Sequence, residues 1–223
     1  MNERERDRLL EAIRQRTGIC YRRDQLASIE RTLTGLMDRL NLDSPDELIA
    51  AVEHRREVYH ELINEITVGE TYFFREPKHF EFIRHTVIPE LRRRRGEQTT
   101  LRAWSAACAS GEEAYSLAIL CDQMSQPVDL IGTDLSPDSI AQARRGLYRE
   151  WSFRGGTMAS MRNYFAERDS PQQPKRYALC EPIKSRVRFR VLNLVAPSYP
   201  DPQTGLSEFD LILCRIVVIY FYR

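Results

Sequence analysis

Apolar residues recur at helical spacing through the first third of the chain, and four such segments predict four helices. The third segment opens on Ser44, which suits a helix N-cap, followed by Pro45 and two acidic residues. No β-rich run occurs before residue 100, so we expect residues 1–75 to form a small helical domain. The apolar stripes consist of Leu9, Leu10 and Ile13, then Leu26, Ile29, Leu33, Leu36, Met37 and Leu40, and finally Val58, Leu62, Ile63 and Ile66.

After residue 100, short apolar runs alternate with helical segments. This alternation is typical of a parallel, doubly wound, Rossmann-like sheet, and we expect such an α/β domain over residues 76–223. Further strands would be needed to complete the sheet, so the sequence looks truncated at its C-terminus. The expected strands are 101–106, 129–134, 187–194 and 209–214; the expected helices are 77–91, 112–124 and 137–147, with Ser136 as N-cap of the last.

A polar stretch interrupts this alternation at about residues 151–186. It contains glycine and proline clusters and no strong periodic pattern. We interpret it as an insertion into the α/β domain.

Composition and charge narrow the possible functions. Hydrophobic residues make up 42% and charged residues 29% of the chain, as in ordinary globular proteins. No apolar run approaches the ~18 residues of a membrane span, and the N-terminus lacks a signal-peptide layout. Five scattered cysteines without a CxxC pair argue against a disulfide framework or a zinc site, which favours a cytoplasmic protein that binds no metal. The net charge is +1, and residues 1–65 carry 11 arginines against 14 acids, which disfavours nucleic acid as a partner.

The first candidate site is the turn at residues 105–113 (SAACASGEE). In open α/β sheets, ligands bind beyond the carboxyl ends of the strands, and this turn follows the first strand. Its small residues and Gly111 allow a close approach of the backbone to a ligand. The turn lacks the GxGxxG pattern, and Glu112 and Glu113 would repel a pyrophosphate. A ligand with a positive group is therefore favoured.

Three more strand ends offer polar side chains. Asp134 ends the second strand and lies 23 residues after Gly111, where an acid suits ribose hydroxyls; a helix cap is the alternative, but Ser136 suits that role better. Asn193 follows the third strand and either contacts an adenine edge or caps the strand. Tyr220 follows the fourth strand and belongs either to the site or to the core.

The junction between the expected domains holds a candidate for substrate binding. Arg75 follows an aromatic pair in the segment 67–77 (TVGETYFFREP), and an arginine there can clamp a carboxylate with two hydrogen bonds. Together these features indicate an adenosine ligand with a cationic end and no phosphates. S-adenosylmethionine, with its ribose, adenine and sulfonium, fits that description.

Several motifs occur in a specific order: TYFFRE at 71–76, WSAACASGEEAYSLAI at 104–119, GTDLS at 132–136, NL at 193–194 and FDLILCR…IYF at 209–221. In this order they resemble the chemotaxis receptor methyltransferases, the CheR family. The resemblance implies an enzyme that transfers a methyl group from S-adenosylmethionine to glutamate side chains on the helical cytoplasmic domain of chemoreceptors. The product would be a γ-glutamyl methyl ester.

The resemblance also implies roles for individual residues. Arg75 and Tyr220 would lie near the transferred methyl group, and the helical N-terminal domain would meet the receptor helices. Residues 164–186 fall where the family carries a small β-subdomain, which in some members docks a receptor tail peptide. The implied cofactor contacts are Gly69, Thr71, Arg75, Glu113, Asp134, Asn193, Leu194, Arg215 and Ile216.

Two positions depart from the family pattern. The family reads CRNV where this chain has Arg215, Ile216 and Val217, so an amide side chain is replaced by an apolar one. Gly69 stands where some members have asparagine. The first departure keeps open a rival function, a non-catalytic module that binds the cofactor or its demethylated product. A methyltransferase that acts on RNA or a small molecule is a second rival, which the acidic balance of residues 1–65 disfavours.

Overall fold

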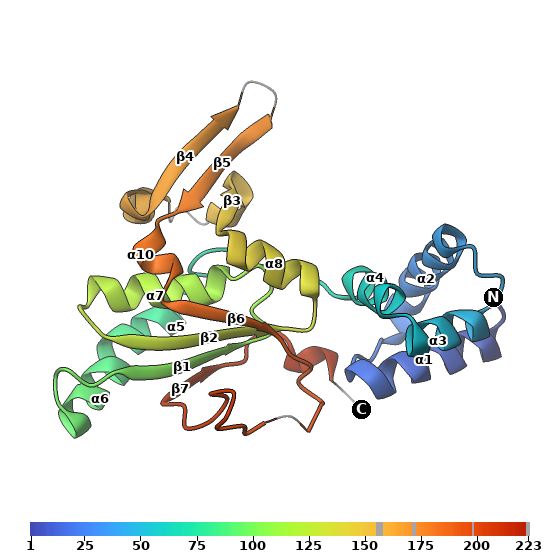
Figure 1. Ribbon diagram of the computed structural model, residues 1–223, viewed down its shortest axis with the longest axis horizontal. Coiled ribbons are helices and arrows are strands. Elements are labelled where there is room, and N and C mark those ends of the chain that lie inside the picture. Colours follow the sequence, from blue (N-terminus) through green and yellow to red (C-terminus); the bar gives the residue numbers. More distant parts are fainter. Residues whose placement is uncertain (155–157, 171–172, 198, 222–223) are drawn as a thin grey trace.

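The computed structural model describes residues 1–154, 158–170, 173–197 and 199–221, and its N-terminal part is a bundle of four helices (Figure 1). This confirms the four helices expected from the apolar stripes. Their buried faces meet in one hydrophobic cluster that reaches from Leu9 to Ile66. The helices are α1 (Glu3–Thr17), α2 (Leu26–Leu40), α3 (Pro45–His54) and α4 (Arg56–Ile66), with a short 3-10 turn, η1 (Arg23–Gln25), before α2.

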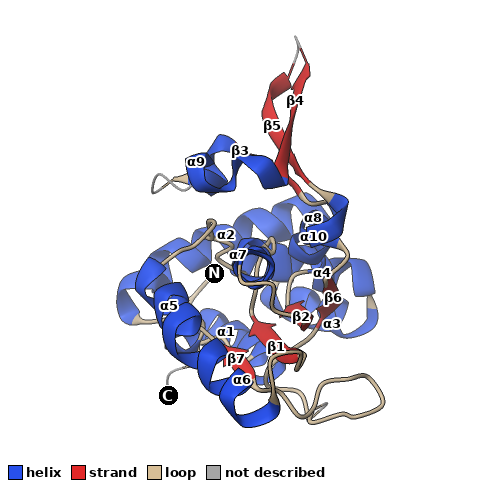
Figure 2. Cartoon of the chain, turned by 90° about the vertical axis from the view of Figure 1, so that its left-hand side faces the viewer, coloured by secondary structure: helices blue, strands red, loops and turns tan. Residues whose placement is uncertain are grey.

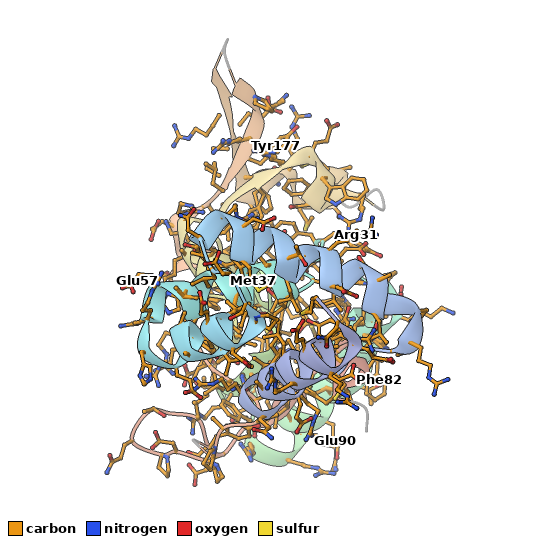
Figure 3. All side chains as sticks on the ribbon, turned by 90° about the vertical axis from the view of Figure 1, so that its right-hand side faces the viewer. Arg31, Met37, Glu57, Phe82, Glu90 and Tyr177 are labelled. Atoms are coloured by element: carbon orange, nitrogen blue, oxygen red, sulfur yellow. The ribbon has the colours of Figure 1, made fainter. Side chains whose placement is uncertain are left out.

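Side-chain caps define where two of these helices, α1 and α3, begin. Asn2 and Glu5 form a reciprocal capping box at the start of α1. The predicted cap Ser44 accepts a hydrogen bond from the Glu47 amide at 3.3 Å. In Figure 3, the labelled Met37 lies among the helices and Glu57 lies at the outer edge of the bundle, which matches the alternation of buried and exposed faces.

The second part of the chain starts with a long helical segment that leads into the sheet. The helix expected over residues 77–91 extends to Arg95. It consists of two α-helices that a π-helical turn joins into one continuous helical segment. The elements are α5 (Pro77–Phe82), the π-turn (Ile83–Val87), α6 (Ile88–Arg95), β1 (Leu101–Ala106), α7 (Glu112–Gln123), β2 (Val128–Asp134), α8 (Pro137–Arg145), β6 (Val187–Val191), β7 (Leu211–Leu213) and η5 (Val218–Tyr220).

Four parallel strands form the central sheet in the order β6-β2-β1-β7. Figure 2 shows them side by side in this order. The chain builds outward from β1 through β2 to β6 and then crosses to the other side of β1 for β7. The strand order therefore reverses at β1, which is where ligands bind in such sheets. The expected parallel α/β sheet is confirmed.

The two faces of the sheet are covered differently. Helices α5 to α8 pack on one face, where the core includes Leu101, Ala103 and Leu130. The other face is covered by the connection between β6 and β7, in which Leu206 packs against Trp104. A loop rather than a helix therefore closes the second face among the described residues.

Three expected boundaries are corrected. The helix expected up to residue 147 ends at Arg145, because Gly146 adopts a left-handed C-cap conformation with φ +61°. The strand expected up to residue 194 ends at Val191, because its partner β2 ends at Asp134. The strand expected over 209–214 is limited to β7, the three residues that pair with β1.

The insertion forms a small antiparallel sheet that projects from the domain (Figures 1 and 2). Its strand order is β3-β5-β4, and β3 begins before the expected start at residue 151. Residues 155–157 and 171–172 of the insertion lie outside the described residues. Its elements are β3 (Leu147–Arg149), η3 (Glu150–Phe153), α9 (Met158–Met161), η4 (Arg162–Tyr164), β4 (Phe165–Ser170), β5 (Gln173–Leu179) and α10 (Glu181–Lys184).

The helical bundle and the α/β part have separate hydrophobic cores. Ile66 belongs to the first core and Phe73 to the second. The domain boundary that we expect at residue 75 stays a prediction; the change from one core to the other falls between Ile66 and Phe73. Among the described helices, none is both long enough and apolar enough to cross a membrane.

Candidate functional site

A cavity of about 190 Å³ lies beyond the carboxyl ends of β1, β2, β6 and β7. All ten residues that the sequence singled out for cofactor or substrate line this one cavity. They come from five separate segments of the chain, so the fold brings together what the sequence keeps apart. They are Gly69, Thr71, Arg75, Glu113, Asp134, Asn193, Leu194, Arg215, Ile216 and Tyr220.

The turn after β1 forms the floor of the cavity. Ala107 and Ala109 both adopt positive φ, at 59° and 47°, and their small side chains leave the backbone open to the cavity. Gly111 has φ +91°, and a Cβ there would lie 2.9 Å from the Cβ of Ala143 and 3.0 Å from Phe189. The glycine expected to allow close approach therefore serves the packing of the turn against α8 and β6.

Asp134 braces this turn from the end of β2. Its carboxylate accepts hydrogen bonds from the Ala109 amide at 2.8 Å and from the Ser136 amide at 2.9 Å. Burial raises the pKa of Asp134, although the backbone hydrogen bonds oppose the shift. The cap of α8 is Ser136, which accepts from the Ser139 amide at 3.1 Å. Asp134 therefore lines the cavity with acceptor capacity left on both oxygens.

The two acids at the start of α7 have different surroundings. Glu112 is buried, accepts from the hydroxyls of Ser110 and Ser152, and is not part of the cavity wall. Burial raises its pKa. The expectation that both acids face a ligand is therefore wrong for Glu112, because its carboxylate turns into the packing between α7 and the insertion.

Glu113 lines the cavity, but it already has a cationic partner. Its carboxylate accepts from the Ser105 hydroxyl at 2.7 Å and from Arg215 Nε at 2.6 Å. Arg215 also donates to the carbonyl of Arg75 at 2.8 Å. This pair joins α7 to the segment after β7, so Glu113 presents a partly neutralised charge to the cavity.

Arg75 lies at the mouth of the cavity on the segment that joins the two domains. Its Nη1 donates to the carbonyl of Glu70 at 2.6 Å, and its guanidinium lies 5.7 Å from the centre of the Tyr72 ring. Among the described residues, no acidic side chain pairs with Arg75. The remaining donors of this guanidinium are available to a carboxylate.

The amide of Asn193 is engaged with protein. Its Nδ2 donates to the carbonyl of Arg16 in α1 at 2.6 Å, and its Oδ1 accepts from the Val195 amide at 3.1 Å. Of the two alternatives left open for Asn193, the observed contacts correspond to a cap of the strand end rather than to a side chain free for an adenine edge.

The segment after β7 supplies the last part of the wall. Ile216 has φ +63°, a left-handed conformation that strains a β-branched residue. Tyr220 lines the cavity from η5, and its backbone carbonyl accepts a hydrogen bond from the Cys20 amide at 2.8 Å. Tyr220 therefore belongs to the cavity rather than to the core.

Sequence reasoning missed one side of the cavity. The connection between α1 and α2 also lines it, through Thr17, Ile19, Tyr21 and Gln25. These residues form no motif, and only the docking of the helical bundle on the sheet brings them to the site. The Tyr21 hydroxyl is buried without a hydrogen-bond partner among the described residues.

Comparisons with known proteins assign nearly the whole chain to one protein family. Residues 4–67 match the family "CheR methyltransferase, all-alpha domain", and residues 69–223 match "CheR methyltransferase, SAM binding domain". "Chemotaxis protein methyltransferase 1" of Pseudomonas aeruginosa is 34% identical over 203 residues, which cover 86% of this chain and 70% of that protein.

Two further relatives carry similar names. "Chemotaxis protein methyltransferase Cher2" of Pseudomonas putida is 32% identical over 215 residues, 92% of this chain and 74% of that protein. "Chemotaxis protein methyltransferase" of Escherichia coli is 33% identical over 178 residues, 78% of this chain and 58% of that protein. With both of its parts matched, this chain belongs to the CheR family of S-adenosylmethionine-dependent methyltransferases.

Proposed function

We propose that this protein transfers a methyl group from S-adenosylmethionine to glutamate side chains of a chemoreceptor's cytoplasmic helical domain, and that the product is a γ-glutamyl methyl ester. The observation that supports this most is the meeting of Arg75, Asp134 and Glu113 in one cavity at the point where the strand order reverses. An acceptor for a sugar, an acid for a cationic group and a cation for a carboxylate are the three features that this reaction needs.

The residues present fit the cofactor. Asp134 keeps acceptor capacity for the ribose hydroxyls, and the small side chains of Ala107 and Ala109 leave room beside it. Glu113 supplies negative charge on the side of the cavity nearest Arg215. When bound, S-adenosylmethionine supplies a methyl group that its sulfonium already activates.

The protein has little chemistry to perform on the substrate. A glutamate carboxylate is ionised near neutral pH, so no general base is required. Arg75 would orient the incoming carboxylate through its free donors, and Tyr220 would shape the slot that holds it. Catalysis would then come from in-line positioning and from the exclusion of water. Too strong an ion pair would hold the nucleophile back, so the role of Arg75 is orientation.

The experiment is methyl transfer from labelled S-adenosylmethionine to a receptor cytoplasmic fragment. Base-labile label on glutamate supports the proposal, whereas cofactor binding without transfer contradicts it. We expect Arg75→Ala to lower turnover at least about tenfold while cofactor affinity falls less. Arg75→Lys keeps the charge without the planar pair of donors, so its turnover should lie between that of the wild-type protein and that of Arg75→Ala. Unchanged turnover of Arg75→Ala at saturating cofactor would contradict the role of Arg75.

One observation favours a second candidate, a module that binds the cofactor and signals without transferring a methyl group. Ile216 places an apolar, strained residue in the cavity wall where the family pattern has an amide. The same labelling experiment decides between the two functions, because a binding module retains S-adenosylhomocysteine affinity and forms no ester.

A further inference from the structure

The guanidinium of Arg154 lies against two aromatic rings, one of which, Tyr72, is on the segment that also carries the cavity residues Glu70 and Arg75. Its Cζ atom is 4.3 Å from the centre of the Tyr72 ring and 4.2 Å from the centre of the Trp151 ring. The Arg154 side chain is only 20% exposed, whereas Trp151 is 68% exposed. Trp151 therefore shields a surface arginine from water while remaining open to solvent itself.

Arg154 also pairs with an acid on the segment that carries Arg75. Its Nη2 donates to Glu70 Oε1 at 3.1 Å, and its Nη1 donates to the carbonyl of Trp151 at 2.9 Å. Among the described residues, Glu70 has no other cationic partner. The pair joins the turn after β3 to the segment that joins the two domains.

Glu70 and Tyr72 are the same residues that hold Arg75. Arg75 donates to the backbone carbonyl of Glu70 at 2.6 Å and lies 5.7 Å from the Tyr72 ring. The Arg75 guanidinium thus already contacts the backbone of Glu70, but no ion pair joins the two side chains in the structure, where the Glu70 carboxylate pairs with Arg154. If a rotation of either side chain brings the carboxylate and the guanidinium together, the two can form a strong, charge-assisted pair.

Arg154 is one of several connections between these two segments. The same two segments are already joined by a hydrogen bond from the Phe73 amide to the Ser152 carbonyl at 2.9 Å. Phe73, which is fully buried, stacks on Phe153 with ring centres 5.1 Å apart. The exposed stack of Tyr72, Arg154 and Trp151 adds to a connection that the core already provides, which points to a role other than folding.

We propose that Arg154 is a positioning residue that occupies the Glu70 carboxylate and so keeps Arg75 free for the substrate carboxylate. This rests on the proposed function. Without Arg154, Glu70 pairs with Arg75 and turns its donors away from the substrate. Trp151 and Tyr72 hold the Arg154 guanidinium by cation–π contacts and reduce its exposure to water.

The test compares Arg154→Ala, Arg154→Lys, Glu70→Gln and the double variant Arg154→Ala/Glu70→Gln in methyl transfer to the receptor fragment. We expect Arg154→Ala to lower kcat about tenfold, within the loss that small misplacements cause, with little change in KM. The double variant should return to the activity of Glu70→Gln, because the competing carboxylate is gone. Arg154→Lys should keep most of the activity, since its charge still occupies Glu70.

Three results would overturn the proposal: wild-type kcat for Arg154→Ala, no recovery in the double variant, or an Arg154→Lys variant as slow as Arg154→Ala. A purely structural role for Arg154 predicts no recovery. Arg149→Ala is the matched control, since it removes an exposed arginine from neighbouring β3 and should leave kcat unchanged.

A second readout is independent of activity. The side-chain Nε–H signal of Arg75 in NMR spectra should move in Arg154→Ala and return in the double variant. If the wild-type protein forms no ester, the proposed function fails, and this signal still decides whether Arg154 keeps Glu70 away from Arg75. An Arg75 signal that is the same in all four variants contradicts the inference.

Discussion

Asn193 Nδ2 donates a hydrogen bond to the carbonyl of Arg16 at 2.6 Å across 177 positions of the sequence. This bond joins the segment after β6 to the C-terminal end of α1. The Cys20 amide makes a second connection when it donates to the Tyr220 carbonyl at 2.8 Å. The helical domain lies beside the C-terminal end of the chain (Figure 1). It closes one side of the cavity through direct contacts with two of the segments that line it.

Replacing the Asn193 amide tests whether this contact supports ligand binding. Asn193→Asp places an acceptor opposite the Arg16 carbonyl, so a hydrogen bond becomes a repulsive contact that costs about 1–3 kcal/mol. We expect weaker S-adenosylhomocysteine binding by calorimetry and a lower melting temperature. Asn163→Asp, at an exposed position outside the cavity, is the control. Equal affinities for the two variants would show that the contact does not shape the site.

Gly18 allows the helical domain to approach the C-terminal segment. It has φ +75°, and a Cβ there would lie 2.4 Å from Val195 and 2.8 Å from Phe221. Gly18→Ala should lower the free energy of unfolding by about 2–4 kcal/mol, from backbone strain and overpacking together, and weaken S-adenosylhomocysteine binding.

Gly205→Ala separates these two effects. Gly205 also has positive φ, at +79°, but its nearest neighbours to an added Cβ are 3.7 Å away or more. Chemical denaturation should show a loss of only about 1–2 kcal/mol for this control, with unchanged ligand affinity. A similar loss of unfolding free energy in Gly18→Ala and Gly205→Ala would mean that Val195 and Phe221 move aside for the added methyl group with little loss of stability.

The pair between Glu113 and Arg215 is largely buried, with side chains 11% and 13% exposed. Arg215→Ala leaves the Glu113 carboxylate without its cation and should cost about 3–5 kcal/mol of stability. Arg215→Ala/Glu113→Gln should cost less than the sum of the two single variants, because no charge is then left unpaired. Urea unfolding of the three variants measures the coupling, and strictly additive losses would argue against it.

The pKa of Asp134, raised by burial, predicts how ligand binding changes with pH. The ionised carboxylate is the acceptor for ribose hydroxyls, so S-adenosylhomocysteine affinity should fall as the pH is lowered toward the raised pKa. Asp134→Asn should bind weakly with a flatter pH profile, which separates Asp134 from Glu70 and Glu113, the other acids among the described residues of the cavity wall. Calorimetry over about two pH units below neutrality measures both profiles.

Acid unfolding through Asp134 would not explain such a loss. An acid whose pKa is raised in the folded state takes up its proton more readily when folded. Its contribution to stability is therefore full at low pH and is lost as the pH rises through the raised pKa. A melting curve recorded at each pH checks this. If the affinity of Asp134→Asn falls with decreasing pH as much as that of the wild-type protein, another titrating group causes the loss.

Ile216 combines a strained backbone with an apolar side chain in the cavity wall. Ile216→Gly should stabilise the fold by about 1 kcal/mol through relief of strain alone. Ile216→Asn should relieve part of this strain, because asparagine tolerates the left-handed region, and should also add a hydrogen-bonding group for the ligand. A gain in S-adenosylhomocysteine affinity for the asparagine variant but not for the glycine variant is the expected result.

Local patterns predicted the elements well where each residue's partner lies close in sequence. Ser44 and Ser136 cap the helices expected of them, because a capping hydroxyl reaches an amide three residues away. The strand ends were harder, and residues 192–194 lie outside β6 because the partner strand stops at Asp134. The length of a strand depends on the length of the strand that it pairs with, and the apolar periodicity of one segment carries no information about its partner.

The sequence by itself determined the order of strands and helices and the residues at the strand ends, since periodicity, caps and small-residue turns act over a few positions. Only the tertiary structure decided that Glu112 turns away while Glu113 pairs with Arg215, and that the α1–α2 connection closes the cavity. Those outcomes depend on contacts between residues that lie from 40 to 177 positions apart in the sequence. Packing and electrostatics select among such contacts only once the chain has folded.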